Sequence, residues 1–407
     1  MHVRPPIVMF LAKTFQTDPR PKQEANSLIE AKYPVYVISW DRESKGPSNP
    51  DRDGAIVRSF RLLNVGASSG FGLALGAMFF QLLLIVECIR MIGRLKQRPI
   101  LHVHDYNTLV PGCFLRALGL SRGLVYDCHE LTYSAYSDLF NALLGAITRV
   151  TELRWSRAAD LLITVSQPIA EYFRQYGIRA EVIYNCPRLS DIPRISKRDA
   201  RNELGLPLDV FLVSYIGSIR YDSGLELLLK VAETAREGHE GIKFLVVGGG
   251  PLASAFKKAA TSSRNRRLSF LPEVSRGRAM LYQVASDLTW AIYDADRASV
   301  NARIGMPWKM FESLACAVPI LVRKGTYRSS LLETIGCGLI VEADRPEEIV
   351  RAISDLAGDT ERYLDKSTRA RQAAISRFNW DRMSERMLRL YDRLIANGHA
   401  HDSPIGG

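Results

Sequence analysis

Short apolar, β-branched runs recur along the chain, and segments with helical spacing of apolar positions separate them. Because these runs are continuous rather than alternating, they indicate strands buried on both faces, as in parallel sheets covered by helices. In the first half, strands are predicted at 7–12, 35–40, 100–104, 124–127, 161–165 and 182–184, and in the second half at 211–216, 244–247, 268–271, 288–292, 320–322 and 339–341. The pattern therefore predicts an α/β protein of two doubly wound, Rossmann-like domains with six strands each.

A break in this pattern marks the domain boundary. The segment 185–207 is rich in proline and charge and has no long apolar run. A chain of 407 residues is also too long for one ordinary core. We therefore predict an N-terminal domain at 1–188 and a C-terminal domain at 189–380. An amphipathic helix is expected at 380–395, and 399–407 is predicted to be a disordered tail.

The composition narrows the class of protein. Contents of 47% apolar and 24% charged residues are typical of a soluble globular protein. Six cysteines lie far apart without a CxxC pair, which indicates reduced thiols in a cytoplasmic protein rather than a disulfide framework or a zinc site. The segment 1–6 lacks the charged-then-apolar order of a secretory signal.

The net charge of +11 would attract nucleic acid, anionic lipid headgroups or small anions. A nucleic-acid-binding role is one alternative, because arginines cluster in the second half, although no recognition motif accompanies them. These arginines are Arg264, Arg266, Arg267, Arg276 and Arg278.

One segment favours lipid among these partners. Residues 71–92 are almost wholly apolar, interrupted by Gln81, Glu87 and Arg90, and a basic group at 94–98 follows. A membrane span is possible by length, but the polar residues would be costly in hydrocarbon. A helix buried in the core and an in-plane helix that dips into a leaflet are the other two interpretations. The sequence leaves all three open.

The most informative candidate site lies near residue 310. Pro307 is well placed to begin a helix whose first turn would hold Lys309 and Glu312 on one face. The first turn of a helix has unpaired N–H groups and a positive dipole end. A ligand with an anionic end and a sugar hydroxyl end, such as a nucleotide, would suit this site.

Glycine turns follow two predicted strands of the second half, with Gly217 after one and glycines 248–250 after the next. Such turns let backbone N–H groups approach a phosphate or a sugar closely. Neither spells GxGxxG or a Walker motif. Nearby Arg220 could bind a phosphate bidentately, or it could lie in solvent beside Asp222.

Histidines beside carboxylates close two predicted strands of the first half. His102, His104 and Asp105 end one strand, and His129 and Glu130 follow the next. The first two histidines face the same side of the strand, but a metal would need a third ligand whose position the sequence does not give. Structural, hydrogen-bonded histidines are the alternative to a site.

Taken in order, these blocks resemble the GT-B glycosyltransferases of family 4, the group 1 transferases. The blocks are Asp18-Pro19-Arg20 with Glu24-Ala25, His102-x-His104-Asp105, Tyr126-Asp127-x-His129-Glu130, Ala159-Asp160 to Ser166, Tyr215-Ile216-Gly217, Gly248 to Pro251 and Pro307-x-Lys309-x-Phe311-Glu312. The final helix, 381–398, resembles the one that crosses back to the first domain in that family. The resemblance implies the GT-B architecture, in which two Rossmann-like domains face a cleft.

The resemblance also implies transfer of a sugar from a nucleoside diphosphate sugar, usually with retention, and it implies no cofactor and no metal. It places donor binding at Gly217, Gly248, Gly249, Gly250, Lys309 and Glu312, catalytic roles at His129, Arg220 and Lys309, and the acceptor side at Asp18, Arg20, His104, Asp105 and Glu130. Glu312 would hold the ribose hydroxyls. Lys309 and Arg220, together with glycine N–H groups, would stabilise the departing diphosphate.

Three positions depart from the pattern of the family. Ile304 stands where many members have the first Glu of an E-x7-E motif, and Ser218 and Ser223 stand at the usual Arg and Lys positions. The alternatives are therefore a catalytically silent nucleotide-sugar-binding partner of another transferase and a nucleotide-sugar 2-epimerase of the same fold. We expect a cytoplasmic enzyme, peripheral on the inner face of the cell membrane, that extends a glycan or a lipid-linked acceptor and does not bind nucleic acid.

Overall fold

The computed structural model describes residues 4–16, 18–40, 54–60, 70–95, 97–235, 241–262, 267–294, 299–342 and 345–399. The chain forms two compact units. The first consists of Met1–Tyr184 and Met383–Gly407, and the second of Asn185–Arg382. The boundaries expected from the sequence, after residues 188 and 380, lie within four residues of these divisions.

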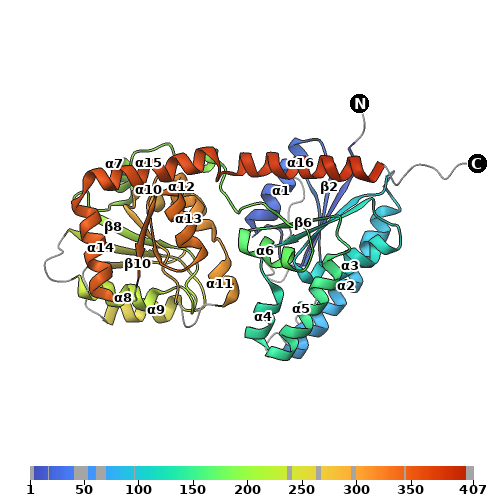
Figure 1. Ribbon diagram of the computed structural model, residues 1–407, viewed down its shortest axis with the longest axis horizontal. Helices are drawn as coiled ribbons and strands as arrows, with labels where there is room; N and C mark the ends of the chain where they lie inside the picture. Colours follow the sequence, from blue (N-terminus) through green and yellow to red (C-terminus); the bar gives the residue numbers. More distant parts are fainter. Residues whose placement is uncertain are drawn as a thin grey trace, which may run out of the picture. The chain divides into compact units, whose positions relative to one another are not determined.

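A parallel sheet forms the centre of the first unit, with strand order β3-β2-β1-β4-β5-β6-β7 (Figure 1). Its strands are β1 Ile7–Leu11, β2 Val35–Trp40, β3 Ile56–Phe60, β4 Ile100–His104, β5 Gly123–Cys128, β6 Leu161–Thr164 and β7 Glu181–Val182. The prediction of six strands was wrong for this unit, since it missed β3. This edge strand pairs on one side only, and its Ile56 is 52% exposed, so it lacks a continuous apolar run.

Helices cover both faces of this sheet (Figure 1). They are α1 Pro19–Glu30, α2 Gly70–Ile92, α3 Tyr106–Ala117, α4 Thr132–Leu139, α5 Ala142–Ser156, α6 Gln167–Gln175 and α16 Trp380–His399. The last helix is longer than the predicted 380–395. The tail predicted at 399–407 begins with the last helical residue, and 400–407 lie outside the described residues.

The second unit is built around a parallel sheet of six strands, as predicted, in the order β10-β9-β8-β11-β12-β13. The strands are β8 Phe211–Ile216, β9 Ile242–Val247, β10 Leu268–Leu271, β11 Leu288–Trp290, β12 Ile320–Arg323 and β13 Gly338–Val341. The helices are α7 Lys197–Leu204, α8 Leu225–Thr234, α9 Ala253–Ser262, α10 Arg276–Ala285, α11 Val300–Ile304, α12 Trp308–Ala315, α13 Tyr327–Ile335, α14 Pro346–Gly358 and α15 Thr360–Ser376, with a short 3-10 helix at Leu189–Asp191.

Helix α2 has one buried and one exposed apolar face. On the buried face, Phe80 stacks on Trp40 of β2 at 5.2 Å between ring centroids. Glu87 is also buried there, and it pairs with Arg58 and Arg90. The interpretation of this segment as a buried core helix therefore accounts for only one face of α2. No helix in the described part of the chain is long and apolar enough to cross a membrane.

Candidate functional site

The glycine turns of the second unit meet at the carboxyl edge of its sheet. Gly217 follows β8 and Gly248 follows β9, and a Cβ atom on Gly248 would lie 1.9 Å from the Gly217 carbonyl oxygen. The backbones therefore touch, which only glycine permits at this position. The backbone N–H groups of Gly217 and Gly248 donate to the carbonyl oxygens of Val247 and Leu271. Of the four glycines predicted to bind a phosphate, Gly249 and Gly250 therefore remain as candidates.

Lys309 is a cation beside the first of these turns, while the Glu273 carboxylate lies next to Gly249. Helix α12 begins at Trp308 with Pro307 as its N-cap, which places Lys309 in the first turn. Its Nζ lies 3.7 Å from the ring centroid of Tyr215, and its stem lies against Gly217. The side chain is 8% exposed, and burial lowers the pKa of Lys309 to about 7. Asp222 compensates this ammonium group in part, but burial, Arg328 and Arg220 outweigh it.

The sequence suggested that Glu312 lies in the first turn of its helix, but in the structure it lies in the second turn of α12. Its Oε1 is 3.2 Å from Nη2 of Arg276, and the Arg276 guanidinium lies over the Trp308 ring. Burial raises the pKa of Glu312, and Arg276 opposes this shift. The sequence associated Arg276 with nucleic acid. Its position just after the β10 strand, at the edge where ligands bind in such sheets, was the signal for a site residue.

The loop after β8 explains why a serine stands at position 223. Ser223 is 3% exposed, and its Oγ accepts a hydrogen bond from the backbone N–H of Arg220 and contacts the Tyr215 hydroxyl. Ser223 therefore holds the turn together. The Arg220 guanidinium is 60% exposed and pairs with Asp222 at 3.0 Å. Its predicted role at the diphosphate stays a prediction.

Sequence reasoning missed a second buried cation, Arg328, in the first turn of α13. It is 3% exposed, and its guanidinium carbon lies 4.2 Å from the ring centroid of Tyr293. The Nζ of Lys309 lies 5.0 Å from the same ring. Tyr293 follows β11 and Arg328 follows β12, so the rule that ligands bind after strand ends would have found both.

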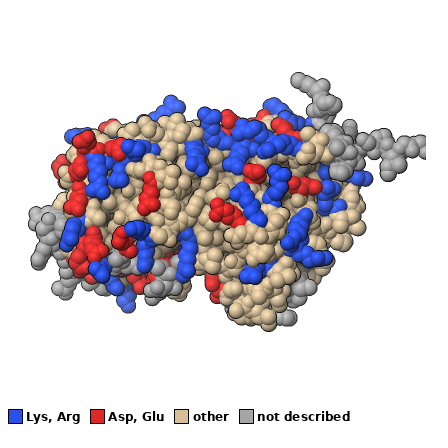
Figure 2. All heavy atoms as spheres, in the orientation of Figure 1, with Lys and Arg blue, Asp and Glu red and all other residues tan. Residues whose placement is uncertain are grey.

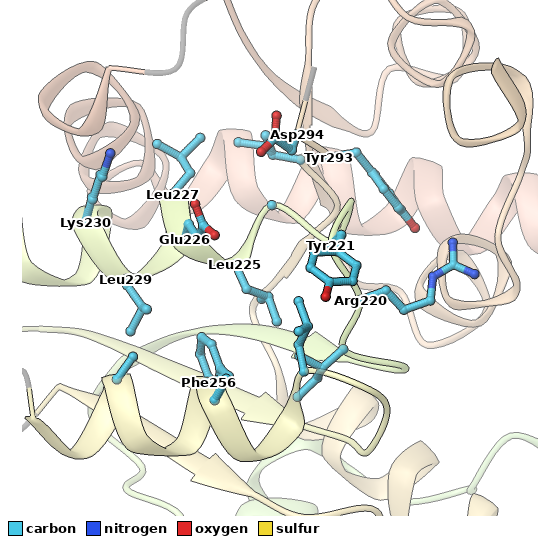
Figure 3. A pocket seen from close by; sticks show the side chains of 16 residues that line it. Arg220, Tyr221, Leu225, Glu226, Leu227, Leu229, Lys230, Phe256, Tyr293 and Asp294 are labelled. Atoms are coloured by element: carbon cyan, nitrogen blue, oxygen red, sulfur yellow. The ribbon is translucent and has the colours of Figure 1, made fainter. Parts of the chain in front are cut away.

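A cavity of about 370 Å³ opens between α8 and α9 (Figure 3). Its walls are mixed: Leu225, Leu229 and Phe256 line it together with Glu226, Lys230 and Asp294. The Arg220 side chain extends away from these walls, on the side where Tyr293 lies (Figure 3).

The predicted acceptor-side residues of the first unit meet around one buried ion pair. Arg20 donates to both oxygens of Asp127 at 2.8 Å and to the Ile183 carbonyl at 2.7 Å. Its Nε also lies 3.1 Å from Glu24. Asp18 caps α1 by accepting from the Arg20 backbone N–H. Arg20 is thus held from several sides and is 2% exposed.

Three histidines surround this pair. The rings of His102 and His104 stack with centroids 4.5 Å apart, and His102 Nδ1 bonds the Tyr391 hydroxyl of α16 at 2.7 Å. His129 lies 2.9 Å from Asp127 through Nε2, and its backbone N–H donates to Asp105.

Asp105 has φ 61° and ψ 167°, a strained conformation outside glycine. The strain accompanies a carboxylate aimed at His129. Glu130 is exposed beside this group.

The charge states in this cluster differ sharply. Burial disfavours the His129 imidazolium, but Asp105 and Asp127 outweigh it and raise the pKa of His129 to about 9. Burial lowers the pKa of His102 and of His104, so both rings are neutral at neutral pH. Burial alone would raise the pKa of Asp127, yet Arg20 and His129 hold it well below its ordinary value.

Four of these residues could in principle hold a metal. Glu24, His102, His104 and Asp127 offer ligand atoms within 4.8 Å of one another, and Glu24 Oε2 lies 3.8 Å from Nε2 of each histidine. The third and fourth ligands that the sequence could not place are therefore present. The guanidinium of Arg20, however, already contacts both carboxylates.

Two family models match the chain, and together they cover more than half of it. "Glycosyltransferase Family 4" matches residues 22–189 and "Glycosyl transferases group 1" matches residues 196–375. Among curated proteins, the chain is 24% identical over 221 residues to D-inositol 3-phosphate glycosyltransferase of Corynebacterium urealyticum, covering 51% of this chain and 50% of that protein. It is 22% identical over 275 residues to the Corynebacterium jeikeium protein of the same name, covering 64% and 63%. The chain thus spans about half to two-thirds of the length of these relatives.

Solved structures share the fold over nearly the whole chain. Sucrose-phosphate synthase of Thermosynechococcus elongatus superposes with a TM-score of 0.75 at 18% identity, covering 97% of this chain and 100% of that one. HepE of Anabaena, solved in complex with UDP-glucose, superposes with a TM-score of 0.70 at 15% identity, covering 95% and 99%. These neighbours show the fold, and the two family models together show that the chain belongs to the glycosyltransferases of family 4, the group 1 transferases.

Proposed function

We propose that the protein is a retaining glycosyltransferase that moves a sugar from a nucleoside diphosphate sugar to a glycan or lipid-linked acceptor. The observation that carries this proposal is the buried Lys309 beside Gly217, with Glu312 one turn further along α12. A desolvated ammonium group stabilises the negative charge that develops on a departing diphosphate more strongly than an exposed one would. Glu312 would then bind the ribose hydroxyls.

Similar proteins support the donor class. HepE was solved with UDP-glucose, and the curated relatives carry names of glycosyltransferases that act on an inositol phosphate. We infer a nucleoside diphosphate sugar as the donor of this chain from the fold that it shares with HepE and from the position of Lys309. The acceptor follows from neither observation.

The protonation of His129 argues against that side chain as the base of an inverting transfer. An inverting transfer needs a general base that takes the acceptor proton. At neutral pH, His129 already carries its second proton because its pKa is about 9. Its ring therefore provides a positive charge near Asp127 and Asp105 rather than a base. We infer that this charge binds the donor sugar or the acceptor.

We further infer that the reaction needs no metal or other cofactor. The support comes from Arg20, whose guanidinium contacts Asp127 at 2.8 Å and Glu24 at 3.1 Å. A divalent cation bound by these carboxylates would lie next to that fixed positive charge. In the second unit, the cations Lys309 and Arg328 would take the place of a metal at the phosphates.

The transfer reaction can be measured with UDP- and GDP-sugars in the presence of EDTA. We expect nucleoside diphosphates to raise the melting temperature and the matching donor to be turned over at equal rates with and without the chelator. Binding without turnover would identify a catalytically silent partner instead. Stabilisation by no nucleotide would disprove the donor site, and loss of activity in EDTA would disprove the metal-free mechanism. The coupling constant of the anomeric proton shows whether the product keeps the anomeric configuration of the donor.

We also infer that the enzyme works at the inner face of the cell membrane. Phe79, Leu82, Val86 and Ile89 form an apolar stripe along α2, between 43 and 61% exposed. On α5, residues 143, 147 and 150 are 51 to 71% exposed. Figure 2 shows a largely uncharged surface at the end of this unit that contains α4 and α5.

Exposed arginines stand beside the stripe at 90, 94 and 98. An apolar helix face flanked by basic residues suits an anionic bilayer surface.

A charge placed in the α2 stripe should release the protein from lipid. The double variant Leu82→Glu, Val86→Glu is expected to lower binding to phosphatidylglycerol vesicles at least tenfold, since each buried apolar side chain contributes about 1.5–3 kcal/mol. Both residues are exposed, so folding should be unaffected. Leu364→Glu, Ile375→Glu on α15 is a control of similar exposure. Equal loss in this control, or no binding by the wild type, would refute the proposal.

A further inference from the structure

One arginine of the second unit contacts the carboxylate that would bind the ribose. Arg276 is the first residue of α10, directly after the N-cap Ser275. Its Nη2 lies 3.2 Å from Oε1 of Glu312, and its guanidinium carbon lies 5.3 Å from the ring centroid of Trp308. Trp308 and Glu312 are four residues apart on α12, so they share one face of that helix. Arg276 contacts both side chains at once.

The two charged groups of this pair differ in their access to water. The Glu312 side chain is 17% exposed, whereas that of Arg276 is 47% exposed. Burial raises the pKa of Glu312, and Arg276 opposes this shift. If Arg276 were removed, the carboxyl group would therefore be neutral over a wider range of pH. A neutral carboxyl group accepts hydrogen bonds more weakly than a carboxylate does.

Other titratable groups lie near Glu312 on the same helix and on the helix packed against it. Lys309 is one turn earlier on α12, and Cys316 follows one turn later, where the Glu312 carboxylate helps to raise the pKa of the thiol. Arg371 of α15 bonds a carbonyl oxygen at the end of α12. Arg276 is thus the cation that lies on the carboxylate itself.

We propose that Arg276 is a positioning residue that holds the Glu312 carboxylate in place for the two hydroxyl groups of the ribose. Arg276 thereby adds a residue to the donor site of the proposed function, on which this inference rests. A carboxylate has four lone-pair sites, so the contact at Oε1 leaves room for both hydroxyl groups. The contact with the Trp308 ring orients the guanidinium plane, and that plane fixes the direction from which Glu312 is held. The same contact keeps the carboxylate ionised.

Nucleotides that differ only at the 2′ position test this proposal. UDP is compared with 2′-deoxy-UDP, and GDP with 2′-deoxy-GDP, by calorimetry over a range of pH. The diphosphate is the same within each pair, so the titration of Lys309 cancels from the ratio of the two affinities. We expect the wild type to prefer the ribonucleotide of one pair by about 10- to 100-fold, the value of one hydrogen bond to a charged group. This preference should fall as the pH is lowered, because Glu312 takes up a proton.

Three variants separate the contribution of Arg276. Arg276→Gln should lower the preference by about two- to fivefold at neutral pH, the range for a partly exposed ion pair, and should move its loss to higher pH. Arg276→Lys keeps the charge without the planar group, so the pH of that loss should return toward the wild-type value. Arg278→Gln removes an exposed arginine of the same helix, which lies over the Tyr282 ring, and should match the wild type.

Two results would overturn the role of Arg276 alone. One is a ribonucleotide preference that Arg276→Gln leaves unchanged in size and in pH dependence. The other is tighter binding of the ribonucleotide by Arg276→Gln, because Arg276 would then compete with the ribose. If the wild type binds both members of each pair equally, or binds neither diphosphate, Glu312 does not bind the ribose. The donor site of the proposed function would then fail together with this inference.

Discussion

Replacing Lys309 by Met is expected to lower donor turnover by about 10²- to 10³-fold, the usual loss when one group that stabilises developing charge is removed. The side chain is buried against Tyr215, and methionine fills a similar volume, so the fold should survive. Steady-state kinetics with the matching donor measure the loss. Lys257→Met, an exposed lysine of α9, should leave turnover unchanged. Full turnover in Lys309→Met would disprove the assignment of diphosphate binding.

The same lysine predicts a pH dependence. In the free protein its pKa is about 7 instead of 10.5, and a bound diphosphate would raise it again. Above pH 7, binding must therefore take up a proton, and affinity should fall by up to about tenfold per pH unit. Calorimetry in buffers of different ionisation enthalpy would detect that proton. A flat affinity profile in the wild type would contradict this prediction.

Lys309 should also affect the stability of the free protein. Between pH 7 and 10.5 the unfolded chain holds the proton that the folded chain has lost, so the free energy of unfolding rises with pH over this window. The rise should be absent in Lys309→Met. Denaturant unfolding of both proteins, measured at several pH values in this range, would show the difference in the free energy of unfolding.

The second large effect is expected at Arg20. Arg20→Met leaves Asp127 buried without its main partner, and breaking a buried pair from one side costs about 3–5 kcal/mol. For a unit of this size, the melting temperature should fall by roughly 10 °C. Because the group is buried, salt should change the result little.

A matched control lies in the same unit. Arg116 binds Asp160 with the same two-pronged geometry, at 3.1 Å for both contacts, but both side chains are about one-third exposed. Arg116→Met should therefore cost no more than about 1 kcal/mol. If both variants lose equal stability, burial does not strengthen the Arg20 pair. The double variant Arg20→Met, Asp127→Asn should recover part of the loss.

Local patterns predicted most elements of this fold because they depend on nearby residues. A continuous apolar run predicts a strand buried on both faces, and such runs predicted twelve of the thirteen strands in the described part of the chain. The strand that the sequence missed, β3, lies at the sheet edge, and none of its five side chains is fully buried. Similarly, α2 has an apolar sequence on all sides, but only tertiary packing showed that one stripe stays exposed.

The candidate site likewise has features that local sequence predicts and features that only tertiary packing sets. The sequence by itself determined that Gly217 and glycines 248–250 follow strand ends and that Lys309 lies in the first turn of a helix. Parallel strands all end at one edge of the sheet, so the glycine turns were expected to meet there. It could not pair Arg20 with Asp127, since 107 residues separate them and only the sheet brings α1 to the end of β5. Nor could it give Lys309 its lowered pKa or place Arg328 next to Tyr293. Burial and long-range neighbours decide these properties, and both exist only in the folded chain.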